Sequence, residues 1–232
     1  SWSLSQAGGE RRALAFLHAT DAAVGLVADA AEALGVAPNL INAWQRALPG
    51  ADAIGLALRD DLKSIRLYTQ YWDAVAARVR AGQDAPAPLY AGFKSLPDGS
   101  TRIDTYTCWP GAPRSEFMPE IEGACLEFGA NPENLAVAFA PLTPEACIFT
   151  RTETEARTSW LATVRRADLS PATVARALAG VTTRLDDGDE IANALAARPL
   201  LHIAGGTDAV KGRFLTLYTE TDAEDLADFI QA

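Results

Sequence analysis

A strand pattern that recurs three times constrains the fold of this chain more than any other feature of its sequence. Each copy is a turn and a basic residue followed by an alternating run that ends in Tyr-Thr, and the copies are DLKSIRLYT (61–69), GSTRIDTYT (99–107) and KGRFLTLYT (211–219). A strand-like run that contains glycine precedes each copy, namely AIGLALR (53–59), LYAGFKSL (89–96) and LHIAGGT (201–207). A hairpin that recurs with similar internal spacing indicates a repeat architecture.

Helical patterns separate these hairpins along the chain. Helices are predicted over residues 10–34, 39–48, 73–82, 115–128, 171–183, 188–197 and 222–230, and further strands over 135–142, 146–153 and 159–166. Hairpins joined through helices favour an antiparallel sheet over the βαβ order of a parallel sheet. About nine strands are enough to close into a barrel, which removes exposed sheet edges. We therefore predict an α+β fold in a single domain, residues 1–232: an antiparallel β-barrel built from repeated β-hairpin/helix units, with the helices outside the barrel.

The composition of the chain argues against some binding partners and indicates a cellular compartment. The chain has 232 residues and a formal net charge of −10, which argues against general affinity for nucleic acid or for a membrane surface. No apolar run approaches the ~20 residues that cross a bilayer, and no signal peptide is visible. Three widely spaced cysteines do not suggest a disulfide framework, so a reducing, cytoplasmic location is expected.

Alternation along the strands sorts the side chains of each hairpin into two faces. One face is apolar and is expected to pack on the helices, whereas the other carries basic residues, tyrosines and glycines. The residues of this second face are Gly55, Ala57, Arg59, Arg66, Tyr68, Gln70, Tyr90, Gly92, Lys94, Arg102, Asp104, Tyr106 and Cys108, with His202, Ala204, Phe214, Thr216 and Tyr218 in the last hairpin. Such a face lies either against solvent, as in many antiparallel sheets, or in the lumen of a closed barrel. We favour the lumen, because ligand pockets combine aromatic walls with a few polar groups.

The spacing Arg66-x-Tyr68 and its counterpart Arg102-x-Asp104-x-Tyr106 resemble the aromatic prenyltransferases of the ABBA barrel type. The segments LGVAPNLINAWQRAL and FGANPENLAVAFAPLTPEACIF are similar to the corresponding passages of small bacterial members. The resemblance implies a ten-stranded antiparallel barrel made of five α-β-β-α units, although the sequence alone shows four hairpins. Two residues depart from the family pattern: Thr216 stands where a basic residue is expected, and Asp104 is acidic.

The resemblance also implies a chemistry for the second face. The basic residues Arg59, Arg66, Lys94 and Arg102 would bind an isoprenoid diphosphate, and Tyr68, Tyr106 and Tyr218 would shield the allylic cation. Asp104 or His202 would accept the proton that the aromatic substrate releases. Arg151 and Arg166 are weaker candidates. The expected partners are an allylic diphosphate and an aromatic or indole-like acceptor, with no metal site and no cofactor, so that magnesium is not required.

Two other functions stay open at this point. One is a non-catalytic or differently catalytic barrel that binds a small anionic or aromatic ligand. An ion pair between Arg66 and Asp104 would favour this function. The other is an open sheet that serves as a protein-interaction surface. The sequence specifies neither the acceptor nor the chain length of the donor nor the oligomeric state.

Overall fold

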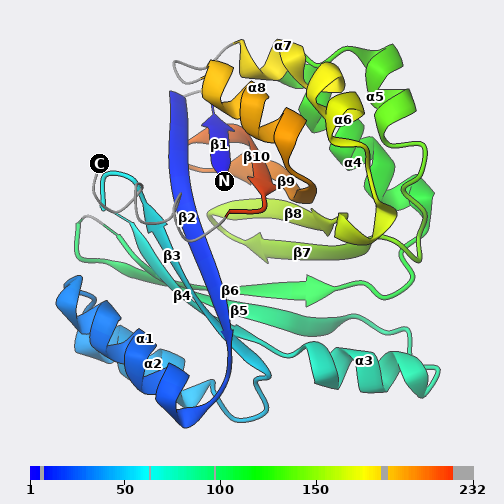
Figure 1. Cartoon of the computed structure of the whole chain (residues 1–232). Helices are drawn as coiled ribbons and strands as arrows, with labels where there is room; N and C mark the ends of the chain where they lie inside the picture. The colour runs from blue at the N-terminus through cyan, green and yellow to red at the C-terminus, as the bar shows by residue number, and fades with distance from the viewer. Residues whose placement is uncertain (6–7, 63, 97, 184–187, 222–232) are drawn as a thin grey trace. The chain divides into compact units, whose positions relative to one another are not determined.

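Ten strands form a closed antiparallel barrel in the order β1-β10-β9-β8-β7-β6-β5-β4-β3-β2, which confirms the predicted fold class (Figure 1). The computed structural model describes residues 1–5, 8–62, 64–96, 98–183 and 188–221. The strands are β1 (Trp2–Ser5), β2 (Gly8–His18), β3 (Ala53–Arg59), β4 (Ile65–Gln70), β5 (Ala87–Ser95), β6 (Thr101–Cys108), β7 (Ile148–Thr154), β8 (Arg157–Thr163), β9 (Leu200–Asp208) and β10 (Gly212–Thr219).

The described helices lie between consecutive hairpins. They are α1 (Asp21–Ala33), α2 (Pro38–Arg46), α3 (Trp72–Arg80), α4 (Arg114–Glu127), α5 (Pro132–Ala138), the 3-10 helix η1 (Arg165–Ala167), α6 (Pro171–Ala177), α7 (Ala179–Thr182) and α8 (Gly188–Ala197). The described residues thus form five hairpins, β1–β2, β3–β4, β5–β6, β7–β8 and β9–β10, and not the four visible in the sequence. The predicted helix over 222–230 lies outside the described residues.

The extra hairpin occupies a segment that was predicted to be helical. Residues 10–18 belong to β2, and the helix begins only at Asp21, so the predicted helix over 10–34 is wrong in its first third. Glu10 to Leu17 include good helix formers, but β2 pairs with β1 and with β3 along its length. The cap residue Thr20 fixes the true start of the helix, because its hydroxyl accepts a hydrogen bond from the Ala23 amide at 3.2 Å.

A second error concerns the segment 135–142, which was predicted to be a strand. Its first half belongs to α5, which begins with Asn131 as the cap and Pro132 in the first turn. The Asn131 side chain accepts a hydrogen bond from the Asn134 amide at 3.0 Å, and proline suits the first turn because it has no amide hydrogen to satisfy. The two strands predicted after this segment are confirmed as β7 and β8.

The chain divides into two compact units, which are described separately. The first, called the 12–108 unit, runs from Arg12 to Cys108; the second, called the 109–221 unit, contains residues 109–221 together with 1–11. The single domain over 1–232 stays a prediction. None of the helices formed by the described residues is long and apolar enough to cross a membrane.

In the 12–108 unit, α1 and α2 cover one face of the strands (Figure 1). Ile54, Leu67 and Phe93 are buried on this face against Trp44 of α2, as alternation predicts. The indole Nε1 of Trp44 also donates a hydrogen bond to the Tyr68 carbonyl at 3.0 Å, which ties α2 to β4. The cover is incomplete over β6, where Ile103 is 53% exposed.

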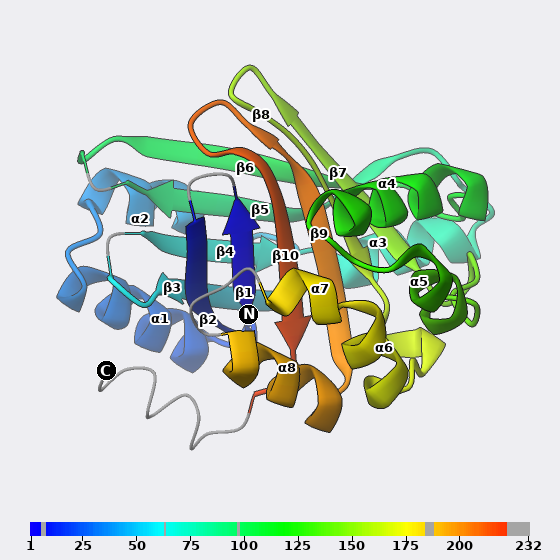
Figure 2. The ribbon, with the colours of Figure 1, turned by 90° about the horizontal axis from the view of Figure 1, so that it is seen from above.

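In the 109–221 unit, the helices that follow β6 and β8 pack on the apolar face of β7 to β10 (Figure 2). Ile203 and Leu215 contribute from the strands, and Phe117, Ile121 and Leu178 contribute from α4 and the end of α6. The predicted parity of the last hairpin is therefore confirmed: Leu215 and Leu217 lie on the helix side.

Candidate functional site

Strand register arranges the polar face of the 12–108 unit in rows, since directly opposed residues of paired strands point to the same side of a sheet. Arg66 is opposite Lys94, and Lys94 is opposite Arg102, so three basic residues form one row across β4, β5 and β6. This face lies away from α1 and α2 and, in a barrel with its helices outside, is the interior face. We call it the basic–tyrosine face.

Two further rows follow toward the other end of the same strands. The next row after the basic one is Phe16, Gly55, Tyr68, Gly92 and Asp104, and the third contains Gln70, Tyr90 and Tyr106. Successive rows are two residues apart along each strand, roughly 7 Å. Cationic, small and aromatic side chains are thus segregated along the strands of this face.

The charge of the basic–tyrosine face is opposite to that of the whole chain. Its charged positions are the cations Arg12, Arg59, Arg66, Lys94 and Arg102 and the single carboxylate Asp104. On these strands cations outnumber carboxylates, although Arg59 is paired with Asp61 of the following turn, whereas the whole chain has a net charge of −10. A positive face within an acidic protein attracts small anions locally.

Asp104 lies between two of the arginines and is fully buried. One carboxylate oxygen is 3.4 Å from Nη2 of Arg66, and the other is 3.1 Å from Nε of Arg102. Neither oxygen accepts a hydrogen bond from any described residue. Charge, and not a set of directional hydrogen bonds, therefore holds this carboxylate beside the guanidinium groups.

Arg66 joins the basic row to the tyrosines. Its Nη1 donates to the hydroxyl of Tyr106 at 2.6 Å and to that of Tyr68 at 3.2 Å, and its guanidinium carbon lies 5.7 Å from the centroid of the Tyr68 ring. Burial favours a lower pKa for Arg66, but Tyr106, Tyr68 and Asp104 together raise this pKa above its ordinary value. Arg66 is only 9% exposed and remains charged, so it does not face bulk solvent.

Four aromatic rings of this face form a closed cycle of contacts. The centroid of Phe16 lies 5.7 Å from that of Tyr68, and Tyr106 lies 6.2 Å from Tyr68 and 6.1 Å from Tyr90. Tyr90 and Phe16 complete the cycle at 6.1 Å. We call these four residues the aromatic cycle.

Two glycines allow the rings to lie close to the strands. A Cβ atom on Gly55 would lie 2.9 Å from the Phe16 ring, and one on Gly92 would lie 3.2 Å from both the Tyr68 and the Tyr106 rings. The glycines of the first two hairpins therefore open space for aromatic side chains. The third hairpin differs, because a Cβ on Gly205 would meet Trp160 on the helix side at 2.7 Å.

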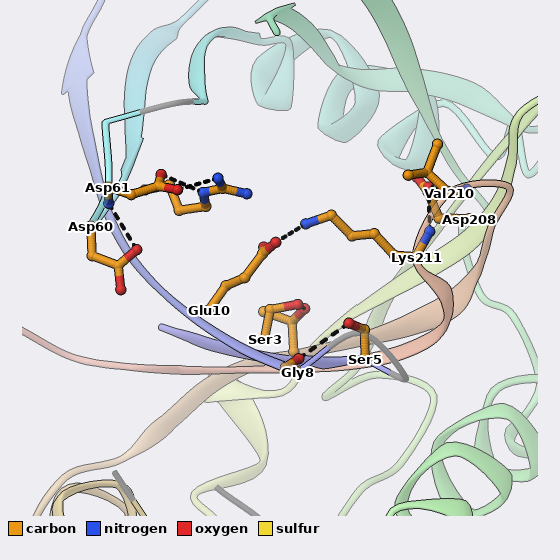
Figure 3. A network of polar contacts seen from close by, with 11 residues as sticks. Ser3, Ser5, Gly8, Glu10, Asp60, Asp61, Asp208, Val210 and Lys211 are labelled. Atoms are coloured by element: carbon orange, nitrogen blue, oxygen red, sulfur yellow. Dashed lines mark hydrogen bonds and ion pairs between the residues drawn. The ribbon is translucent and has the colours of Figure 1, made fainter. Parts of the chain in front are cut away.

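The structure brings most of the predicted binding residues together and adds two that the sequence reading missed. Arg66, Tyr68, Lys94, Arg102, Asp104 and Tyr106 lie in neighbouring rows of one face. Phe16 was missed because its strand was predicted to be a helix. Alternation already placed Tyr90 on this face, but Tyr90 was not predicted to bind a ligand because it lies outside the repeated basic-x-Tyr spacing. Arg59 lies at the end of β3 and forms an ion pair with Asp61 in the following turn. Figure 3 labels Asp61.

His202 and Tyr218 belong to the 109–221 unit, where they contact each other. They are directly opposed on β9 and β10, and their rings meet edge to face at 5.6 Å. Nδ1 of His202 lies 2.8 Å from the Thr163 hydroxyl. Here the residue opposite the repeated tyrosine is a histidine, whereas glycine lies opposite Tyr68 in the first hairpin.

Acidification is expected to destabilise the fold through His202. Burial, with the nearby charge of Arg165 as a second cause, lowers the pKa of His202 from 6.5 to about 4. The unfolded chain then binds the proton more readily, so stability is lost as the pH falls from 6.5 toward 4, by about 3 kcal/mol. Urea unfolding across this range should show a smaller loss in His202→Gln. The exposed His18 is the matched control: an equal change in His18→Gln would contradict the assignment.

The remaining arginine candidates lie elsewhere in the 109–221 unit. Arg151 lies 5.4 Å from the centroid of the Phe149 ring and 3.7 Å from the Glu120 carboxylate of α4, so it is on the helix side. Arg166 lies in η1. Near the β9–β10 turn, Lys211 and Glu10 point toward each other as an ion pair (Figure 3). Neither Arg151 nor Arg166 contributes to the basic–tyrosine face.

The described residues contain no group of three or more His, Cys, Asp or Glu side chains arranged to hold a metal ion. The geometry of the basic–tyrosine face instead suits a ligand that combines an anionic group with an apolar or aromatic body. Comparison of the chain with models of known protein families and with curated proteins found no match to either.

Proposed function

We propose that the chain transfers a prenyl group from an allylic diphosphate to an aromatic or indole-like acceptor. The observation that carries the proposal is the row of Arg66, Lys94 and Arg102 beside rows of tyrosines on one interior face. Guanidinium and ammonium groups suit a diphosphate, and tyrosine rings suit an allylic cation. The five hairpins interleaved with helices also agree with the ABBA resemblance at the level of fold.

In the proposed reaction the bond between the allylic carbon and the diphosphate oxygen breaks, and its electron pair leaves with the diphosphate. The basic row stabilises this departing charge, while Tyr68, Tyr106 and the other rings of the aromatic cycle exclude water from the cation. A π electron pair of the acceptor ring forms the new carbon–carbon bond, and the ring then loses a proton. Asp104, which lies beside the basic row, is the proposed acceptor of this proton. A weak base is sufficient there, because the protonated ring is strongly acidic.

A second function is supported by a specific contact. Asp104 already offsets part of the charge of Arg66 and Arg102. A face of moderate positive charge also suits a barrel that binds a small anionic or aromatic ligand without prenyl transfer.

Both functions predict that the basic row binds an anion, and Arg102 tests this. Arg102→Ala is expected to weaken binding of dimethylallyl and geranyl diphosphate about tenfold or more, because it removes a charge-assisted contact. Calorimetric titration measures the affinity. Arg78→Ala, which removes an exposed arginine from α3 of the same unit, should bind like the native protein. The proposal fails if dimethylallyl, geranyl and farnesyl diphosphates all leave the native protein without detectable binding.

Product formation separates the two functions. Incubation of the native protein with a bound donor and a panel of phenols and indoles should release pyrophosphate together with a prenylated product, which mass spectrometry detects. Donor binding without any product would favour the non-catalytic barrel.

A further inference from the structure

We propose that Asp104 is an internal counter-ion of the basic row, which sets how strongly this face binds anions and which anionic charge it prefers. The inference rests on the proposed function only in requiring that the face binds an anion. It assigns to Asp104 a role in specificity, in addition to the proton transfer proposed above.

Three features of Asp104 support this role. The carboxylate is fully buried, and it contacts Arg66 and Arg102 at 3.4 and 3.1 Å. Its oxygens accept no hydrogen bond from any described residue. The carboxylate is therefore held by the positive charge of the two guanidinium groups and not by hydrogen bonds from their N–H groups. A phosphate or diphosphate group has more acceptor oxygens and binds guanidinium in bidentate geometry. An incoming anion can therefore form better bonds to the same arginines.

The position of Asp104 keeps its charge on the face after a ligand binds. Asp104 lies within β6, where it is opposite Gly92 of β5, and the preceding row contains Lys94 and Arg102. Because β6 is paired with β5 on both sides of Asp104, its backbone cannot move the carboxylate away from the basic row. The carboxylate thus repels a bound anion, and this repulsion grows in proportion to the charge of the anion.

The consequence is a preference for anions of low charge. The row of Arg66, Lys94 and Arg102 carries +3, and Asp104 reduces the sum to +2. Removal of the carboxylate should therefore strengthen the binding of every anion. The gain should be larger for pyrophosphate than for phosphate, because pyrophosphate carries more negative charge.

The test compares the affinities of Asp104→Asn and the native protein for inorganic pyrophosphate and phosphate by calorimetric titration at pH 7.5. We expect the variant to bind pyrophosphate at least ~10-fold more tightly and phosphate roughly 3-fold more tightly. Asp98→Asn is the matched control, because it removes the same charge from the exposed turn between β5 and β6. Its affinities should stay close to those of the native protein.

Asp104→Ser, which also removes the charge and leaves room for water, repeats the test if the asparagine variant does not fold. Equal or weaker pyrophosphate binding in a folded variant would overturn the inference, since it would show that Asp104 positions the arginines for the ligand. Undetectable pyrophosphate binding in a folded variant would also overturn it. Tighter binding without prenyl transfer by the native protein would support the inference while refuting the enzymatic function.

Discussion

Replacement of Arg66 by methionine is expected to lower the free energy of unfolding by about 3 kcal/mol, because it leaves the Asp104 carboxylate buried beside one guanidinium instead of two. Methionine retains much of the aliphatic volume of arginine, so the loss of charge dominates. The variant also loses the donor that Arg66 offers to the hydroxyls of Tyr68 and Tyr106. Urea denaturation monitored by circular dichroism measures the change.

A double variant separates the charge from the packing. Arg66→Met combined with Asp104→Asn should be less destabilised than Arg66→Met alone, because no unbalanced carboxylate remains in the interior. Arg78→Met, on the exposed side of α3, should change stability by less than about 0.5 kcal/mol. Additive effects of the two substitutions at Arg66 and Asp104 would contradict the proposed coupling.

The same variant should lose affinity for the allylic diphosphate. Arg66 lies at the β4 end of the basic row and is the most buried of its three cations. A charge-assisted bond made in such a site has a larger effect than one at the surface, so a loss of about 100-fold is expected. Binding comparable to that of the native protein would exclude Arg66 as a ligand contact.

Alternation along single strands was enough to predict most of the basic–tyrosine face. Arg66 and Tyr68 are separated by one residue, and so are Asp104 and Tyr106, which places each pair on one side of its strand whatever the partner strand is. The row of Arg66, Lys94 and Arg102 depends in addition on the register between three strands. A tight turn fixes part of that register, but the pairing of β4 with β5 joins segments separated by α3.

The contribution of β2 could not be predicted from local pattern. Residues 10–18 have the composition of a helix, and only pairing with β1 and β3 makes them a strand. The structural context therefore outweighs local propensity, and Phe16 enters the aromatic cycle as a result. The resemblance to a family with five hairpin units was the one signal that pointed to a missing hairpin.

The third copy of the repeat shows why a shared motif does not define a shared site. Tyr218 occupies the repeated tyrosine position, but His202 is opposite it, and Gly205 lies on the helix side beside Trp160. The spacing of glycine and tyrosine is the same as in the first hairpin, yet the register of the pair differs. The residue opposite Tyr218 is His202, three positions before Gly205, and an odd difference in register moves the glycine to the opposite face.

Replacement of Gly180 by alanine is expected to be among the most damaging single substitutions in the 109–221 unit. A Cβ atom at this position of α7 would lie 2.0 Å from the Gly129 carbonyl oxygen and 3.0 Å from its carbonyl carbon. Both are backbone atoms, so no side-chain rotation can relieve the overlap, and α7 must move away from the end of α4. Leu178 and Val181, which flank the contact, are completely buried. We expect a loss of about 3 kcal/mol or more in unfolding free energy.

Gly123→Ala provides a matched control, because the same substitution should there have the opposite sign. Gly123 lies on an exposed part of α4 in the same unit, and a Cβ atom on it would have no neighbour within 4 Å. Alanine favours the helix over glycine by about 0.5–1 kcal/mol, so Gly123→Ala should stabilise the protein slightly. Urea denaturation of the two variants distinguishes a steric cause from a general effect of alanine. If both variants were stabilised, the close approach of α7 to the end of α4 would be refuted, and with it the packing that covers β9 and β10 on the side opposite His202 and Tyr218.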